Sequence, residues 1–184
     1  MEGGYALCDT PIGRCAIAWR GPHIVRTALP HAQDAALRAR FADLHEAEAP
    51  PFVGSVIARL VALLSGEPHD LADVPVHFGG ASAFERQVWE AARRIPVGEV
   101  RSYGAIAEEI GAPRAGQAVG RALGHNPVPI IVPCHRVLAA DGRSGGFSAP
   151  GGVNTKFRIL QIEKARRAGE AGLFATLPLA VKPR

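Results

Sequence analysis

The sequence predicts an α/β protein in two structured parts, the second of which contains a helix-turn-helix. Residues 5–28 alternate loosely between apolar and polar side chains and are interrupted by turn residues, which indicates short strands. Apolar residues recur at helical spacing over 35–41 and 53–64, and two short helical patterns on either side of Gly111 follow. A chain of 184 residues can form one large or two small domains, which excludes a peptide hormone or a small disulfide-stabilised fold.

The first part, over residues 1–80, should be a small domain of two or three strands followed by two helices. Turn signals at 9–13 and 21–22 separate the strands. Over 67–80 the helical pattern weakens, and prolines and a glycine pair appear. This segment is therefore predicted to be a linker with a short strand near 74–78, and we place the domain boundary at its end.

The second part, over residues 81–168, is expected to be mainly helical. Ser82 and Glu85 have the S-x-x-E spacing of a capping box, which predicts a helix over 83–94. Residues 169–184, which follow the last predicted helix, are treated as a C-terminal tail.

The helix-turn-helix lies in the middle of this second part. Ser102 can cap a helix over 103–110, Gly111 ends it, and Pro113 is placed to open a second helix over 113–124. The exposed face of the second helix has almost no bulky side chains, so its backbone could closely approach a partner such as DNA. The same composition is also typical of a helix that packs tightly against its neighbour.

Charge is distributed unevenly between the two parts. The net charge is +4, yet residues 1–83 carry 6 Lys and Arg against 9 Asp and Glu, whereas residues 84–168 carry 13 against 7. A basic C-terminal part that contains a helix-turn-helix favours a nucleic-acid partner, and a solvated, mildly basic surface is the alternative. Neither a membrane segment nor a secretory signal is visible.

The most unusual segment is 126–137, a short apolar run between prolines that leads to Cys134 and His135. It should be buried and extended and end in a turn at Cys134. A histidine beside a cysteine can accept the thiol proton, although adjacent residues of an extended chain point to opposite faces, so contact requires a turn or an intervening water. Glu163 lies in line with the apolar stripe of the last helix; it either orients His135 from a buried position or bends out to solvent.

The other cysteines do not suggest a metal site or a disulfide framework. Cys8, Cys15, His23 and His31 lack the spacing of zinc ligands, and we predict no metal. Three cysteines are too few and too unevenly spaced for a disulfide framework, which points to a reducing compartment, the cytoplasm.

Several motifs occur together and in one order over about residues 82–165. They are Ile95-Pro96, Gly98-Glu99-Val100, Ser102-Tyr103, Ala118-Val119-Gly120, Asn126-Pro127, Pro133-Cys134-His135-Arg136-Val137, and the closing Lys156, Leu160 and Glu163. In these motifs the chain resembles the O6-alkylguanine-DNA alkyltransferases. In the N-terminal part the resemblance is limited to the turn Thr10-Pro11-Ile12-Gly13 and the order of elements.

The resemblance implies a ribonuclease H-like N-terminal α/β domain and a winged-helix-like C-terminal domain. It further implies a monomeric, single-turnover methyltransferase without a cofactor. Such a protein binds duplex DNA in the minor groove, turns the damaged guanine out of the stack, and moves the O6-alkyl group irreversibly onto Cys134.

The resemblance also assigns roles to individual residues. Cys134 is the acceptor, His135 the base acting through water, and Glu163 its orienting carboxylate. Asn126 supports the turn, and Tyr103 contacts the guanine ring and the 3′ phosphate and protonates the leaving base.

The remaining implied contacts involve the lesion and the duplex. The Val137 backbone would read the exocyclic amine of guanine, and Ser148 would lie near O6. The expected DNA-binding residues are Ser102, Arg114, Ala115, Gln117, Ala118, Gly120 and Arg121.

The sequence departs from the family pattern at three places. Gln117 occupies the position of an arginine that enters the stack, Phe147 replaces a tyrosine, and Ala149-Pro150 lengthens the loop after Ser148. These departures leave two alternatives open, namely alkyl transfer from a free base or small donor, and a non-enzymatic binder of lesions or operators. A pure binder would have no need of Cys134.

Overall fold

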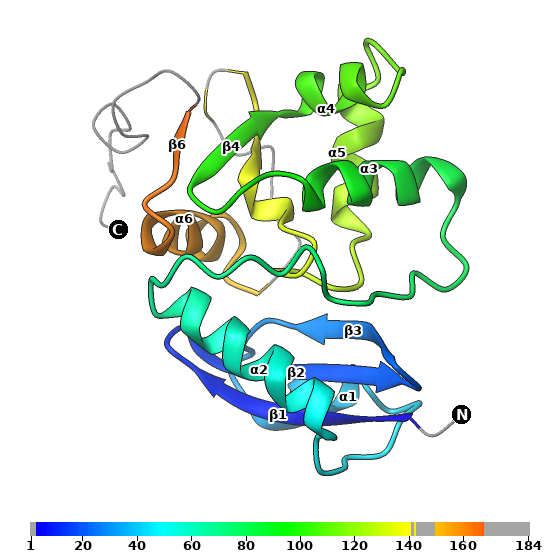
Figure 1. The fold of residues 1–184 in the computed structure, drawn as a ribbon, viewed down its shortest axis with the longest axis vertical. Helices are drawn as coiled ribbons and strands as arrows, with labels where there is room; N and C mark the ends of the chain where they lie inside the picture. The colour runs from blue at the N-terminus through cyan, green and yellow to red at the C-terminus, as the bar shows by residue number, and fades with distance from the viewer. Residues whose placement is uncertain (1–2, 141, 143–149, 168–184) are drawn as a thin grey trace.

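A three-stranded antiparallel sheet forms the N-terminal part of the computed structural model, which describes residues 3–140, 142 and 150–167 (Figure 1). Its strands β1 (Gly3–Thr10), β2 (Gly13–Arg20) and β3 (His23–Ala28) follow one another in space in chain order. The turn between β1 and β2 depends on Gly13, whose φ of 123° is open to glycine and costly for other residues. The prediction of two or three strands is confirmed.

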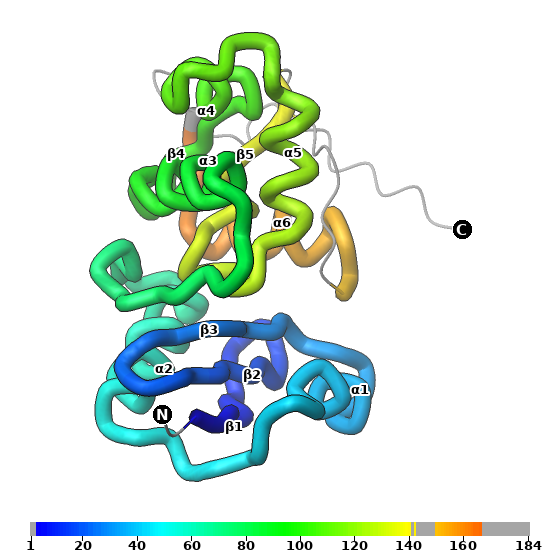
Figure 2. The backbone as a smooth tube through the Cα atoms, turned by 90° about the vertical axis from the view of Figure 1, so that its right-hand side faces the viewer, coloured from blue at the N-terminus to red at the C-terminus, as the bar shows by residue number. Residues whose placement is uncertain are grey.

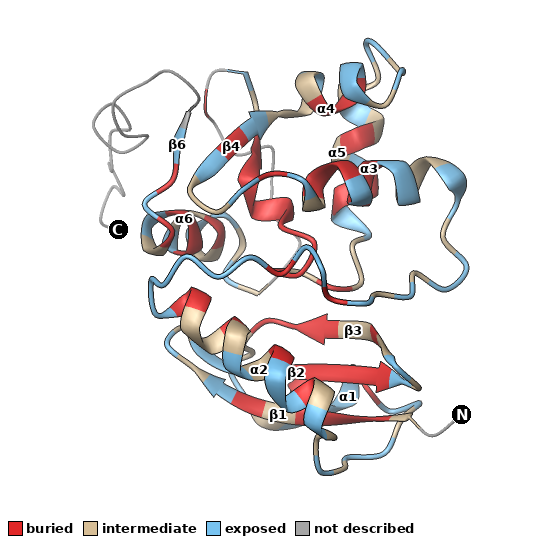
Figure 3. Ribbon diagram, in the orientation of Figure 1, coloured by how far each residue is buried: buried red, intermediate tan, exposed pale blue. Residues whose placement is uncertain are grey.

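Two helices cover opposite faces of this sheet. Alternate residues of a strand point to opposite sides, and on β2 the side chains of Ile17 and Trp19 join one apolar cluster with α2 (Pro51–Leu64), while Ala16 and Ala18 join another with Leu37 of α1 (Asp34–Ala39). The middle strand is therefore buried on both sides (Figure 3).

Three helices form the upper half of the molecule in Figure 1: α3 (Ala83–Arg93), α4 (Tyr103–Glu109) and α5 (Gly116–Gly124). The predicted capping box exists, because the Glu85 amide donates to Ser82 Oγ at 3.2 Å and the Ser82 amide donates to Glu85 at 2.9 Å. Ser102 caps α4 by accepting from the Ala105 amide at 3.0 Å. These short helices pack around Val88, Ile106 and Val119, which are all fully buried.

A second sheet, with strand order β5-β4-β6, lies beside these helices. It consists of β4 (Glu99–Ser102), β5 (Val137–Leu138) and β6 (Arg166–Arg167), and both of its pairings are parallel. A one-turn 3₁₀ helix (Cys134–Arg136) leads into β5, and α6 (Gly152–Ile162) leads towards β6. The sequence analysis missed these strands, since two to four residues show no period.

Two predicted elements need correction. The second helix of the helix-turn-helix begins at Gly116 instead of Pro113, because Arg114 has a φ of 72°, in the left-handed region that cannot continue a helix. The strand expected near 74–78 is reduced to a single bridge between Val76 and Ile24.

In Figure 2 the helical part lies above the N-terminal sheet. The two parts contact each other along an apolar cluster that contains residues of β2, α2, α3 and the segment before Cys134. The division into domains at residue 80 stays a prediction. No helix in the described part of the chain is long and apolar enough to cross a membrane.

Candidate active site

Asn126 holds the segment that delivers Cys134. Its side-chain oxygen accepts from the Val128 amide at 3.0 Å, and its side-chain nitrogen donates to the Val132 carbonyl at 2.9 Å and to Cys134 Sγ at 3.3 Å. One amide therefore closes a loop and contacts the thiol at the same time, an arrangement that the predicted supporting role of Asn126 requires.

The segment between Asn126 and Cys134 is a tight loop, so the expectation of an extended chain was wrong. The Val132 amide donates to the Val128 carbonyl at 2.9 Å, and Ile130 between them has a φ of 76°. A β-branched residue rarely adopts this conformation, so neighbouring contacts must hold it there. Burial of Val128, Ile130, Ile131 and Val132 offsets this strain.

Cys134 and His135 lie in the turn that the sequence required. Both are buried, with 7% and 0% of their surface exposed. Within the described residues no hydrogen bond joins the thiol to the imidazole, and His135 Nδ1 is buried there without a protein partner. Proton transfer between the two groups would therefore need a bridging water, and the role of His135 as base stays a prediction.

Glu163 is buried behind His135, so the solvent-facing alternative was wrong. Its Oε1 lies 3.0 Å from His135 Nε2. Arg136 also binds both carboxylate oxygens, through Nε at 2.9 Å and Nη2 at 2.8 Å, and its Nη1 donates to the Ile95 carbonyl at 2.8 Å. One carboxylate thus holds the histidine and neutralises a buried arginine.

The pKa values of this group follow from burial and from the pairing. Burial alone would raise the pKa of Glu163, but His135 and Arg136 lower it to about 2, so the carboxylate is ionised. Burial lowers the pKa of His135 below its usual value, and Glu163 only partly opposes this. A neutral His135 whose Nε2 donates to Glu163 leaves Nδ1 as the basic atom.

Burial also raises the pKa of the Cys134 thiol, against the opposing effects of the Asn126 amide and the Lys156 ammonium. The resting group is therefore a thiol, whereas the reactive species is the thiolate. Formation of the thiolate therefore requires a base, for which the expected residue is His135.

Lys156 is a site residue that the sequence analysis named only as part of a motif. It is 1% exposed, its Nζ donates to the Val137 carbonyl at 2.7 Å and to the Tyr103 hydroxyl at 3.5 Å, and burial lowers its pKa to about 8. A lysine at an apolar position is the signal that could have identified it, because a buried ammonium needs acceptors.

The residues expected to bind substrate are only partly placed. Tyr103 begins α4, and its ring lies against the Gly116 and Gly120 face of α5, 3.8 Å from where a β-carbon at Gly120 would lie. The Val137 carbonyl accepts from Lys156 at 2.7 Å, and its role in reading guanine stays a prediction. Ser148 and Phe147 lie outside the described residues.

The expected DNA-binding residues gather around the helix-turn-helix. Arg114, Gln117 and Arg121 are exposed, while Ala115, Ala118 and Gly120 are half-buried, as is Ser102, whose hydroxyl serves the α4 cap. No cluster of three or more His, Cys, Asp or Glu side chains that could hold a metal ion exists in the part of the chain that the structure describes.

Comparison with known proteins matches this arrangement to one family. The model of the 6-O-methylguanine DNA methyltransferase DNA binding domain matches residues 83–165. The methylated-DNA–protein-cysteine methyltransferase of Mycobacterium tuberculosis is 40% identical over 170 residues, which cover 92% of this chain and 98% of the relative. The chain belongs to the methylated-DNA–protein-cysteine methyltransferase family.

Further members of the family agree in sequence and in fold. The methyltransferase of Haemophilus influenzae is 34% identical, over 87% of this chain and 86% of its own. The crystal structure of Mycobacterium tuberculosis OGT in complex with DNA superposes with a TM-score of 0.73 at 37% identity, over 90% of this chain and 96% of the other. The resemblance seen in the C-terminal motifs therefore extends through the N-terminal part.

Proposed function

We propose that this protein repairs DNA by direct reversal, moving the O6-alkyl group of an alkylated guanine in duplex DNA irreversibly to Cys134. The observation that carries the proposal is the buried thiol of Cys134 beside the His135–Glu163–Arg136 group, on a helix-turn-helix scaffold. Membership of the methyltransferase family supports the same reaction.

The proposed reaction needs only groups of the chain and one water. The thiol proton passes through the water to His135 Nδ1, and Glu163 stabilises the imidazolium. Cys134 Sγ then forms a bond to the alkyl carbon while the bond from that carbon to guanine O6 breaks. The base leaves with an added electron pair, and Tyr103 donates a proton to its ring nitrogen.

Lys156 supports the leaving step in this scheme. Its ammonium donates to the Tyr103 oxygen and so favours donation of the phenol proton to guanine. Its charge also stabilises the Cys134 thiolate that precedes transfer. With both bonds changed, the thioether has no route back, so each molecule reacts once.

The first prediction tests the transfer itself. Incubation with duplex DNA that contains O6-methylguanine should make the Cys134 peptide one methyl group heavier and leave ordinary guanine in the DNA. Cys134→Ser should remain unmodified, because an alcohol is a far weaker nucleophile at neutral pH. Intact lesion and unchanged peptide mass in the wild-type protein would remove the proposal. A faster reaction with the free modified base would favour a small-molecule donor. This alternative arises because Gln117, a neutral residue, stands where the family has an arginine that enters the base stack.

The second prediction concerns the DNA interface, which we place on the exposed side of α5 around Gln117. Arg114→Gly and Arg121→Ala should each lower the slope of log Kd against log salt by about 1, since each removes one phosphate contact. Arg114→Gly also relieves the residue from its φ of 72°, so loss of folding would not explain weaker binding.

A matched control for these two variants is Arg20→Gln. Arg20 is exposed on the N-terminal sheet, beside Asp43 at 3.5 Å. Its loss should leave the salt slope unchanged. Equal slopes for the wild-type protein, Arg114→Gly and Arg121→Ala would move the DNA-binding surface away from α5 and the turn before it.

The finer assignments belong to the same proposal. The antiparallel sheet with α1 and α2 supports a ribonuclease H-like N-terminal domain over 1–80, and the helix-turn-helix beside the second sheet supports a winged-helix-like domain over 81–168. The three unpaired cysteines support a reducing compartment such as the cytoplasm. We propose a monomer that contacts one lesion at a time.

A further inference from the structure

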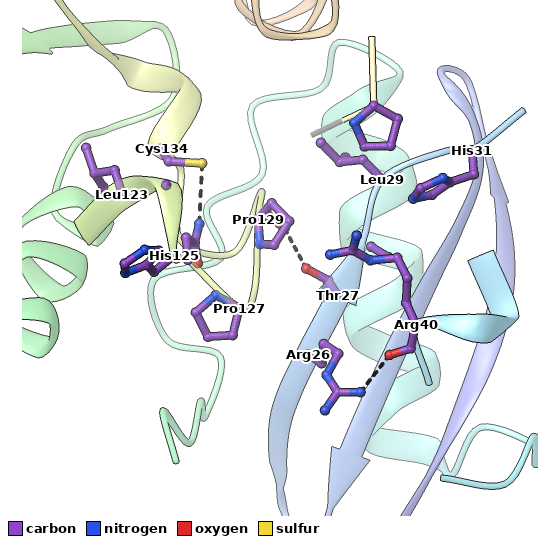
Figure 4. Close-up of a pocket in the computed structure, with 14 residues that line it drawn as sticks. Arg26, Thr27, Leu29, His31, Arg40, Leu123, His125, Pro127, Pro129 and Cys134 are labelled. Carbon is purple, nitrogen blue, oxygen red and sulfur yellow. Dashed lines mark hydrogen bonds between the residues drawn. The ribbon is translucent and has the colours of Figure 1, made fainter. Parts of the chain in front are cut away.

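Thr27 on strand β3 binds the loop that delivers Cys134. Its backbone amide donates to the Pro127 carbonyl at 2.9 Å, and its hydroxyl donates to the Pro129 carbonyl at 2.8 Å. Only 5% of its surface is exposed. Figure 4 shows this bond between Thr27 and Pro129. Both residues, together with Cys134, line a cavity of about 300 Å³.

The two carbonyls that Thr27 binds flank Val128, in the strained part of the loop. Prolines have no amide hydrogen, so the loop can pair with β3 here through its carbonyl groups but not through the nitrogens of Pro127 and Pro129. Ile130, with a φ of 76°, follows directly. A conformation of this kind persists when surrounding contacts determine it, and Thr27 supplies two of those contacts.

The same loop carries the Asn126 amide that reaches Cys134 Sγ. Asn126 is fixed through Val128 and Val132, the residues at the two ends of the tight turn. Relaxation of the Pro127–Pro129 segment is therefore expected to weaken the hydrogen bond between the Asn126 amide and the thiol. Burial of Cys134 raises the pKa of its thiol, and the Asn126 amide opposes that rise.

We infer that Thr27 is a positioning residue for alkyl transfer: through its two hydrogen bonds the N-terminal sheet holds the 126–132 loop in the strained form that aims Asn126 at Cys134. This inference rests on the proposed function. It gives the N-terminal part a task in the reaction, although none of its residues belongs to the proposed proton route.

The test uses two substitutions at Thr27 in the full chain. Thr27→Val keeps the shape, the β-branching and the backbone amide, but it loses the hydroxyl and leaves the Pro129 carbonyl without its donor. Thr27→Ser keeps the hydroxyl. Thr27→Val should slow transfer from duplex O6-methylguanine about tenfold with an unchanged DNA Kd, and Thr27→Ser should restore the rate to within about twofold of the wild type.

A second readout is the pH profile of the reaction of Cys134 with iodoacetamide, followed by mass at the Cys134 peptide. Among the described residues, the Lys156 ammonium acts on this thiol, and His135 follows it in the chain. The cavity that Cys134 lines is also lined by charged or titratable side chains of the N-terminal part and of the end of α5, namely Arg26, His31, Arg40 and His125. None of these groups is altered in the variants. The weaker Asn126 hydrogen bond in Thr27→Val should move the profile to higher pH. Loss of stability alone would not shift the profile of the folded protein.

Arg158→Met is the matched control. Arg158 is exposed on α6 and donates to the Pro11 carbonyl at 2.9 Å, a contact between the same two parts of the chain that bypasses the loop. Its rate and pH profile should equal those of the wild type. A similar slowing in Arg158→Met would mean that any contact between the two parts of the chain affects the rate, and it would overturn the inference.

Two further outcomes would also overturn it. In the first, folded Thr27→Val transfers the alkyl group at the wild-type rate and shows the wild-type pH profile with iodoacetamide. In the second, Thr27→Ser and Thr27→Val slow the transfer equally. Should Thr27→Val not fold, Thr27→Ala loses the same hydroxyl with less bulk and takes its place. A wild-type protein that transfers no methyl group removes the proposed function, while the iodoacetamide profiles still decide whether Thr27 positions the thiol.

Discussion

Replacing Glu163 by Gln should slow alkyl transfer by about 100-fold or more and destabilise the protein by about 3 kcal/mol. The rate falls because a neutral amide cannot stabilise the imidazolium that His135 forms. The stability falls because Arg136, bound to both oxygens of Glu163, becomes a buried charge without a counter-ion. Chemical denaturation and single-turnover transfer rates measure the two effects separately.

The pH dependence of this stability difference identifies its source. The pKa of Glu163 is lowered from 4.5 to about 2, so its pairing stabilises the fold fully above pH 4.5 and is lost as the pH falls towards 2. The gap between the wild type and Glu163→Gln should therefore shrink over that range. If the stability difference between the wild type and Glu163→Gln stayed constant from pH 6 to 2.5, loss of the Glu163 ion pairs would not be its cause.

Glu109→Gln is the matched control for this prediction. Glu109 also joins two arginines, Arg94 and Arg101, but its side chain is 25% exposed and both arginines face solvent. Screened pairs of this kind contribute little, so the variant should lose less than about 1 kcal/mol and transfer at the wild-type rate. A comparable loss in both variants would mean that burial is not the deciding factor.

The sequence was sufficient for the elements whose residues carry a local signal. The helix α2 was predicted from apolar spacing alone, and the starts of α3 and α4 from Ser82 and Ser102, since a cap acts on backbone groups only a few residues away. The approach of Glu163 to His135 was one of two alternatives that the sequence left open, and it was suggested by the need of a carboxylate on an apolar stripe for a partner.

The features that could not be predicted depend on contacts between distant segments. The short strands β4, β5 and β6 form because α6 and the 3₁₀ helix bring their backbones together, and nothing in a two-residue segment encodes that pairing. The left-handed conformations of Arg114 and Ile130 are likewise imposed by the tertiary structure, because neither residue favours them. The double role of Glu163 was missed since Arg136 was considered only as part of a motif.

Replacing Lys156 by Met should abolish most of the activity without unfolding the protein. We expect transfer at least about 100-fold slower, because the variant loses the positive charge near the thiolate and the donor to Tyr103. Burial of the Lys156 ammonium destabilises the folded protein at neutral pH. Its pKa is lowered from 10.5 to about 8, which corresponds to roughly 3 kcal/mol in the free energy of unfolding. Methionine removes that cost but also removes the Lys156 hydrogen bond to the Val137 carbonyl, so the variant should be about as stable as the wild type or more so.

The sign of the pH effect makes this prediction specific. Because the folded protein releases the Lys156 proton near pH 8 and the unfolded chain near pH 10.5, the lysine makes wild-type stability rise with pH across that window. Between pH 8 and 10.5 the free energy of unfolding of the wild type should therefore increase relative to that of Lys156→Met. Groups that do not interact with Lys156 cancel in this difference. Cys134 does interact with it, so both proteins are compared in the Cys134→Ser background.

Lys164→Met provides the comparison that separates charge from position. Lys164 is exposed just beyond the end of α6, so its replacement makes the same change in net charge without touching the site. Lys164→Met should transfer at the wild-type rate. The difference between its free energy of unfolding and that of the wild type should not change comparably with pH. If Lys164→Met were as slow as Lys156→Met, net charge would explain the loss. If Lys156→Met were slow only because it unfolds, the buried ammonium would be a structural support and not part of the proton-donating pair with Tyr103.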